Sequence, residues 1–165
     1  DSVATTASSS SAELVTALGA DVVIDYRKQD FADLISDYDL AIDAVGGDNL
    51  LATLGVVKSG GLVLGITGPP DPGFAKQLGA PKPFEFVLGL LSRKVRSAAK
   101  KHGAHYAFFF MHASGQQLRE LGALYDSGAL RPVIDSTFEF DQTLEAIERV
   151  ESGRSSGGKV VITHE

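Results

Sequence analysis

Short apolar runs alternate with amphipathic segments along the first part of the chain. The runs at 22–24, 40–42 and 62–67 are rich in Val, Ile and Leu, as in strands of a parallel sheet that is covered on both faces. Segments whose apolar residues recur at helical spacing lie between these runs, for example at 50–57. This alternation predicts an α/β fold with a Rossmann-like, doubly wound and mostly parallel sheet.

The chain opens with a strand, a turn, a helix and a second strand. Residues 1–6 are short and β-branched, and Ser8–Ser11 supply hydroxyls where a helix leaves its first N–H groups unpaired. Glu13 follows Ser10 at the spacing of a capping box. The turn has no acid that would repel a ribose 2′-phosphate, and free helix N–H groups would bind one. Alternatively, the four serines form only a helix cap and a surface turn.

A proline-rich loop begins an insertion that covers about residues 69–103. Within it, residues 84–101 are predicted to form one helix with an apolar first half and a second half rich in Lys and Arg. Such a helix lies on a membrane or another anionic surface, or it has a solvated basic face over a buried apolar face. Because the net charge of the whole chain is −6, we favour the second interpretation.

The remaining pattern predicts a fifth strand at 106–111, on the outer edge of the sheet. The last part of the chain is predicted to contain a helix at 116–125, an antiparallel strand at 132–140, a helix at 143–151 and a strand at 159–163. We therefore expect a partial nucleotide-binding domain at 1–130, followed by a strand–helix–strand segment at 131–165.

Composition excludes several kinds of site. The acidic balance argues against nucleic-acid binding. Absence of cysteine excludes disulfides and thiolate metal sites, and the four histidines show no metal-ligand spacing, so no metal is expected. Without a signal peptide or a run that could span a membrane, we expect a cytoplasmic protein that does not engage membranes.

Four segments in order, LVTALGADVVIDYR, YDLAIDAVGG, SGGLVLGITGPPDP and SGRSSGGKVVI, resemble the medium-chain dehydrogenase/reductase superfamily. The similarity is greatest to its zinc-free quinone oxidoreductase, zeta-crystallin-like branch. It implies the nucleotide-binding portion of an NADPH-dependent oxidoreductase that transfers hydride to a quinone or an activated carbonyl or alkene. It also implies that the first Rossmann strand, its glycine-rich loop and the catalytic domain are missing, so that the chain alone is inactive. The last two strands would belong to that catalytic domain. The alternative is a non-catalytic dinucleotide-binding or dimerisation module.

The resemblance implies two groups of residues that bind NADP(H). Around the adenosine ribose and its 2′-phosphate it places Ser8, Ser9 and Tyr26. Many relatives carry a lysine at the position of Ser11, so Arg154 or Lys159 would supply the missing positive charge here. Near the nicotinamide it places Val45, Gly46, Gly47, Gly65, Ile66, Thr67, Phe108, Phe109 and Phe110. From the residues alone, the glycine pair at 46 and 47 is equally well explained as a turn. No residue matches a proton donor, so the catalytic residues are unassigned.

Two expectations concern strand pairing. Without the first Rossmann strand, the strands at 3–5 and 40–42 lose their common neighbour, and we expect direct pairing between them or a swapped segment. The strand at 106–111 is apolar, with neither charge nor proline to protect it. We expect it to pair with its copy in a homodimer, whereas the competing possibility is that the 84–101 helix covers it.

Overall fold

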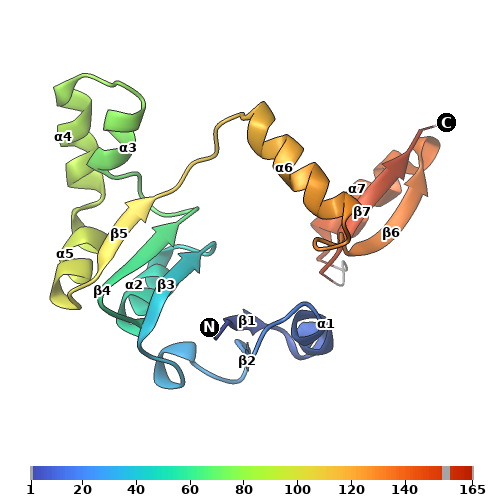
Figure 1. Cartoon of the computed structure of the whole chain (residues 1–165), viewed down its shortest axis with the longest axis horizontal. Coiled ribbons are helices and arrows are strands. Elements are labelled where there is room, and N and C mark those ends of the chain that lie inside the picture. Colours follow the sequence, from blue (N-terminus) through green and yellow to red (C-terminus); the bar gives the residue numbers. More distant parts are fainter. Residues whose placement is uncertain (1, 154–156, 165) are drawn as a thin grey trace. The chain divides into compact units, whose positions relative to one another are not determined.

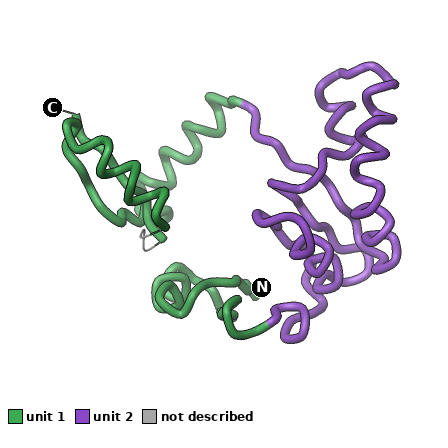
Figure 2. The backbone as a smooth tube through the Cα atoms, turned by 180° about the vertical axis from the view of Figure 1, so that it is seen from behind, with its two compact units in different colours: residues 1–29, 113–165 green, residues 30–112 purple. Residues whose placement is uncertain are grey.

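The computed structural model describes residues 2–153 and 157–164. The chain forms two compact units, residues 1–29 with 113–165 (unit 1) and residues 30–112 (unit 2) (Figure 2). Parallel strands and helices alternate in both, so the chain has the expected Rossmann-like α/β character (Figure 1). The expected division into a domain at 1–130 and a segment at 131–165 stays a prediction.

Unit 1 contains two separate two-stranded parallel sheets. Its elements are β1 (Ala4–Ala7), a 3-10 turn (Ser9–Ser11), α1 (Ala12–Ala17), β2 (Val22–Asp25), α6 (Gly115–Asp126), β6 (Ile134–Glu139), a second 3-10 turn (Phe140–Gln142), α7 (Thr143–Glu151) and β7 (Lys159–Thr163). β1 pairs with β2, and β6 pairs with β7. The antiparallel orientation expected at 132–140 is wrong, because α7 acts as a crossover that returns the chain to its original direction.

Unit 2 is a three-stranded parallel sheet in the order β3-β4-β5. Its elements are a 3-10 turn (Phe31–Asp33), β3 (Tyr38–Asp43), α2 (Gly47–Val56), β4 (Val57–Gly65), α3 (Pro72–Gln77), α4 (Lys82–Leu91), α5 (Arg93–Lys101) and β5 (His105–Phe108). The core joins α2 and α5 to one face of the sheet through Leu50, Leu54, Val57, Val63, Val95, Ala99 and Ala104. Leu40 and Ile42 point to the other face and are exposed, so the expectation of a strand buried on both faces is wrong for β3.

The structure differs from three further predictions made from the sequence. β5 ends at Phe108, so 109–111 follow the strand instead of extending it, although β5 is the edge strand of its sheet as expected. The single helix expected at 84–101 is two helices, because Ser92 lies between them with its hydroxyl bonded back to the carbonyl oxygen of Leu88 at 2.6 Å. Among the described residues, β1 and β3 lie in different sheets, so the direct pairing of these strands is wrong.

The capping box expected at the start of α1 is also wrong. Ser11 is the N-cap residue and makes no side-chain capping bond. The serine hydroxyls bond one another instead, with Ser8 Oγ at 2.9 Å from Ser10 Oγ and 3.2 Å from Ser11 Oγ. Among the described residues, no helix has the length and apolar content needed to cross a bilayer.

Candidate functional site

The carboxyl ends of β3, β4 and β5 meet at one edge of the unit 2 sheet. The backbone N–H of Ile66 donates to the carbonyl oxygen of Asp43 at 2.8 Å, and the N–H of Phe109 donates to Gly65 at 3.0 Å. The residues that follow the three strands are therefore held side by side. In open α/β sheets, ligands bind outside this edge.

A glycine turn after β3 exposes backbone at this edge. The buried carboxylate of Asp43 accepts the N–H of Gly46 at 2.6 Å, which fixes the turn at the start of α2. Gly46 and Gly47 have φ values of 79° and 60°. A Cβ at Gly46 would lie 3.1 Å from Thr67 Oγ1, whereas a Cβ at Gly47 would meet nothing within 4 Å. The backbone at Gly47 is thus open to close approach by a planar ligand.

Tyr106 links the loop after β4 to the sheet by a hydrogen bond. Its hydroxyl donates to the carbonyl oxygen of Pro69 at 2.8 Å. The ring fills the space beside Gly65, where a Cβ would lie 2.9 Å from Tyr106 Cε2. Burial raises the pKa of Tyr106 to about 12, with smaller contributions from the charges of Asp71 and Asp43. The phenol therefore stays a neutral hydrogen-bond donor to this loop.

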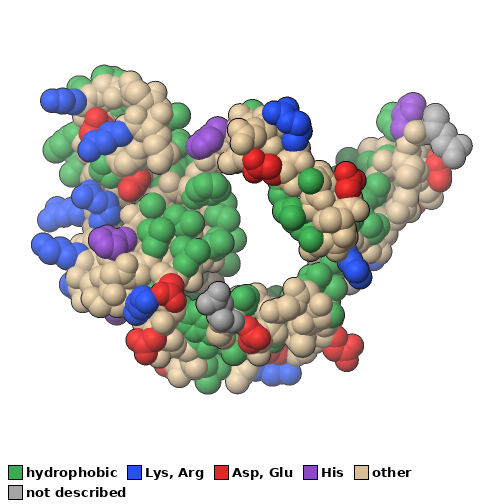
Figure 3. All heavy atoms as spheres, viewed as in Figure 1, with side chains coloured by type: hydrophobic (Ala, Val, Ile, Leu, Met, Phe, Trp, Pro, Cys, Tyr) green, Lys and Arg blue, Asp and Glu red, His purple; other side chains and the backbone are tan. Residues whose placement is uncertain are grey.

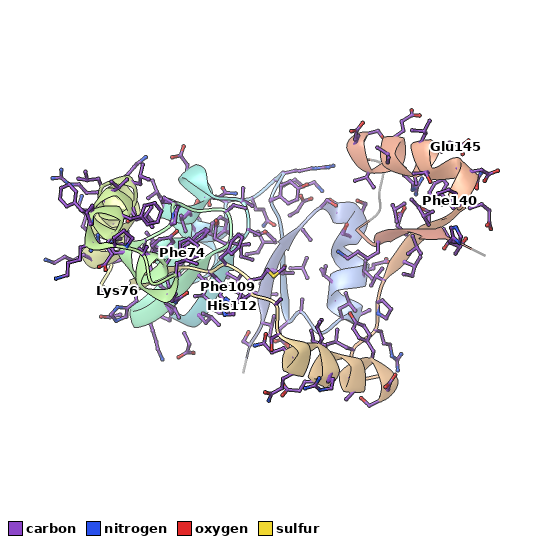
Figure 4. The ribbon with its side chains drawn as sticks, turned by 90° about the horizontal axis from the view of Figure 1, so that it is seen from above. Phe74, Lys76, Phe109, His112, Phe140 and Glu145 are labelled. Atoms are coloured by element: carbon purple, nitrogen blue, oxygen red, sulfur yellow. The ribbon has the colours of Figure 1, made fainter. Side chains whose placement is uncertain are left out.

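An aromatic cluster stands at the end of β5. The ring centroid of Phe74 lies 5.1 Å from that of Phe108 in an edge-to-face arrangement and 5.9 Å from that of Phe110. Phe74 comes from α3, whose N-terminus is capped by the Asp71 carboxylate at 3.0 Å from the Phe74 N–H. Figure 4 labels Phe74 and also Phe109, which is exposed after the strand. These rings, with exposed Val45 and Ile66, give the edge an apolar rim.

In unit 1, the ends of β1 and β2 bring polar groups together. The Ser9 hydroxyl donates a short hydrogen bond to Asp25, and Lys28 Nζ lies 3.0 Å from Ser9 Oγ and 3.3 Å from Asp25 Oδ2. The hydrogen bond from Ser9, then that from the Arg27 N–H and the nearby Lys28, lower the pKa of Asp25. The turn at 6–9 itself contains no acid, but the paired strand β2 brings an ionised acid, Asp25, and a lysine beside Ser9.

Tyr26, Lys159 and Arg154 were also expected near the ribose. Tyr26 is exposed, and the Arg27 guanidinium carbon lies 5.7 Å from its ring centroid. Lys159 is the exposed first residue of β7. Arg154 lies outside the described residues. Among the described residues, Lys28 is a positive charge in hydrogen-bond contact with Ser9.

A family model described as zinc-binding dehydrogenase matches residues 18–162. The chain belongs to this family. Solved quinone oxidoreductases of the medium-chain dehydrogenase/reductase superfamily share its fold, which confirms the resemblance seen in the sequence. In the residues that the structure describes, no group of three or more His, Cys, Asp or Glu side chains is placed to hold a metal ion.

Three relatives illustrate the family. The 2-methylene-furan-3-one reductase of Solanum lycopersicum is 34% identical over 163 residues, which are 97% of this chain and 33% of the relative. The chloroplastic NADPH-dependent alkenal/one oxidoreductase of Arabidopsis thaliana is 31% identical over 162 residues, with the same two coverages. The quinone oxidoreductase structure from Coxiella burnetii matches with a TM-score of 0.75 and 25% identity, over 99% of this chain and 45% of that one. The chain thus spans a third to a half of these family members.

Sequence reasoning missed Phe74, Tyr106, Asp25 and Lys28. Asp25 and Lys28 could in principle have been found from the sequence, because parallel strands end at the same edge of a sheet. In the observed register Asp25, the last residue of β2, lies opposite Ala7, the last residue of β1. No local signal connects Phe74 to β5, since the two meet only through the fold of the insertion.

Proposed function

We propose that this chain is the nucleotide-binding portion of an NADPH-dependent oxidoreductase that reduces quinones or activated carbonyl or alkene compounds. The family membership supports it, as do relatives named as NADPH-dependent alkenal/one and quinone oxidoreductases. The open glycine turn at Gly47, beside an apolar rim at the carboxyl ends of three parallel strands, is the single observation that carries it.

In this proposal the unit 2 edge holds the nicotinamide. Gly47 allows the flat ring to approach the backbone, Gly46 packs the turn against Thr67, and Gly65, Ile66 and Thr67 border the ring. Phe108, Phe109 and Phe110, supported by Phe74, supply an apolar wall that excludes water from the reacting atoms. NADPH supplies the hydride when it is bound, and this chain orients it.

Unit 1 holds the adenosine ribose in the same proposal. Ser9 and Lys28 bind the 2′-phosphate, with Ser8 and Tyr26 beside it. A phosphate would replace Asp25 as the acceptor for both the Ser9 hydroxyl and the Lys28 ammonium group. Asp25 opposes that phosphate by its charge, while Arg27 and Lys28 together outweigh it.

Cofactor binding by the full-length protein tests this assignment. NADPH should bind more tightly than NADH, as measured by the rise in nicotinamide fluorescence. Lys28→Ala should reduce the ratio of the two affinities about 10- to 100-fold, because a hydrogen bond to a charged group contributes about 1.5–3 kcal/mol. Asp25→Asn should raise the ratio, and Lys76→Ala, an exposed lysine of α3, should leave it unchanged. Equal affinities for NADPH and NADH in the unmutated protein would refute the assignment.

Turnover is tested with the same protein. It should oxidise NADPH in the presence of a simple benzoquinone or an α,β-unsaturated ketone. We also propose that it acts without zinc and in the cytoplasm, so a chelator should leave the rate unchanged and a tagged copy should be found outside the organelles. No NADPH consumption with any of these acceptors would contradict the proposed activity, whatever the binding result.

We further propose a homodimer formed by β5. The strand is the edge of its sheet, and Phe109 and Phe110 beside it are exposed. Pairing with its copy across a twofold axis would complete this edge and close after two copies. Phe109→Lys should give a monomer by light scattering, whereas Lys76→Ala should remain a dimer. A monomeric unmutated protein at micromolar concentration would exclude the dimer.

A further inference from the structure

The side of α4 that faces away from the core is apolar and exposed. Leu88 is buried, with 4% of its surface exposed, and it identifies the side of the helix that faces the core. Phe86 and Leu90 lie two residues to either side of it, which places them opposite Leu88 at 100° per residue. They are 68% and 55% exposed. The sequence expectation of a buried apolar half is therefore wrong for α4, because most of its large apolar side chains point outward.

Val87 and Leu91 extend this surface, at 47% and 61% exposure. We call Phe86, Val87, Leu90 and Leu91 the α4 outer face. Their spacing of i, i+1, i+4 and i+5 makes one continuous stripe. Isolated apolar residues on a surface need no explanation, but a contiguous apolar stripe on a soluble protein marks a surface that binds something.

The next helix continues this surface with positive charge. Val95 and Ala99 are the buried side of α5, and all five of its Lys and Arg residues are exposed on the other sides. Lys100 and Lys101 occupy the last turn, where the helix dipole favours cations. Arg93 and Lys94 occupy the first turn, where the dipole disfavours them. Helix stability therefore does not account for these two cations, which directly follow the α4 outer face.

The charge around α4 and α5 is opposite to that of the whole chain. Residues 72–112 carry seven Lys and Arg and one acid, Glu85. The whole chain carries 15 Lys and Arg and 21 Asp and Glu. Lys94 Nζ lies 4.0 Å from Asp48 Oδ1, and both side chains are exposed. Figure 3 shows Lys and Arg side chains gathered over α4 and α5, with apolar side chains between them. This local excess of positive charge indicates an anionic partner.

We propose that the α4 outer face and the basic side of α5 dock onto the surface of an anionic lipid membrane. Phe86, Leu90 and their neighbours enter the boundary between headgroups and acyl chains, while Arg93 and Lys94 contact lipid phosphates. Apolar side chains next to lysines and arginines are the composition of interfacial helices. Docking would place the protein beside apolar molecules dissolved in the membrane. It needs no spanning helix, and it replaces the expectation from the sequence that the chain does not engage membranes.

A second copy of the chain is a poorer occupant for this face. If two copies paired through α4 about a twofold axis, Arg93 and Lys94 of one copy would approach either the same residues or, in an antiparallel pair, the Lys82 end of the other α4. Like charges brought together at an interface are unfavourable. An anionic lipid surface instead complements both the apolar and the basic parts of the face.

Vesicle sedimentation of the full-length protein tests this proposal. The protein should sediment with vesicles made of equal parts phosphatidylcholine and phosphatidylserine, and remain in solution with phosphatidylcholine alone. Each cation near an anionic surface contributes about a fivefold increase in partitioning, so Arg93→Ala with Lys94→Ala should weaken binding about 30-fold. High salt should have a similar effect. Leu90→Asp should abolish sedimentation.

Matched controls separate this face from general changes in charge or hydrophobicity. Leu118→Asp introduces the same change at an exposed apolar position of α6, and Arg119→Ala removes an exposed cation of that helix. Both should bind vesicles like the unmutated protein. Circular dichroism should show that the α4 and α5 variants stay folded.

The proposal is overturned if the unmutated protein does not sediment with anionic vesicles. It is also overturned if folded Leu90→Asp binds them normally, because the contact would then be electrostatic only. Full competition by soluble phosphoserine would likewise show a phosphate site in place of a membrane surface. NADPH binding is measured separately, so failure here does not depend on the proposed oxidoreductase function.

Discussion

Gly68→Ala tests whether Tyr106 determines the position of the loop after β4. Gly68 is buried, and a Cβ there would overlap the Tyr106 hydroxyl and lie 2.9 Å from Leu50 Cδ2. Leu50 is 1% exposed and packed in the unit 2 core, so it has little room to move. Overpacking of this kind costs about 1–3 kcal/mol. Loss of the hydrogen bond from Tyr106 to Pro69 adds about 1 kcal/mol. We expect the free energy of unfolding to fall by about 2–4 kcal/mol.

Urea denaturation of the purified protein, followed by circular dichroism, measures this loss. Tyr106→Phe removes the hydroxyl that the new methyl group would overlap. In that background the added Cβ still meets Leu50, but its next neighbour is the ring carbon 3.4 Å away. Gly68→Ala should therefore cost at least about 1 kcal/mol less there, a coupling typical of residues in contact.

A matched control comes from α6. Gly122 has nothing within 4 Å of a built Cβ, so Gly122→Ala should stabilise the protein by up to about 1 kcal/mol. Equal costs of Gly68→Ala with and without the Tyr106 hydroxyl would refute the reasoning. The loop would then be positioned by Leu50 alone, and Ile66 and Thr67 would not depend on the phenol.

Local patterns predicted the elements whose ends are marked by local chemistry. α7 at 143–151 and β7 at 159–163 have the predicted bounds. Gly19 ends the first helix with a φ of 109°, which an L side chain rarely adopts. These features depend on neighbours within a few residues, and those neighbours are visible in the sequence.

Features that depend on distant partners were not predictable in the same way. Ser9 was expected beside the cofactor ribose or in a helix cap, and nothing local indicated that Lys28, 19 residues later, donates a hydrogen bond to its hydroxyl. The β6 pattern could not distinguish a parallel from an antiparallel neighbour, because alternation reports burial and not strand direction. For α4, periodicity identified an apolar helix, but only the packing of Leu88 shows which side faces the core.

Two further predictions concern the interior of unit 2. Leu54→Ala should lower the free energy of unfolding by about 2.7–5 kcal/mol, because Leu54 is fully buried, and exposed Leu118→Ala should change it little in the same urea assay. The second prediction concerns pH and follows from the raised pKa of Tyr106, about 12 when folded against about 10 when unfolded. Since folding favours the neutral phenol, this contribution is complete below about pH 10 and is lost as pH rises towards 12. Two pKa units correspond to about 2.7 kcal/mol, and partial exposure reduces the expected loss to about 1–2 kcal/mol. Lysines titrate in the same range, so the measurement is the difference between the unmutated protein and Tyr106→Phe in urea midpoints at successive pH values. The difference should narrow as pH rises, because the ionised phenol loses its advantage over phenylalanine. A difference that stays constant from about pH 9 to 12 would show that the phenol is not buried against the Pro69 loop as the structure places it.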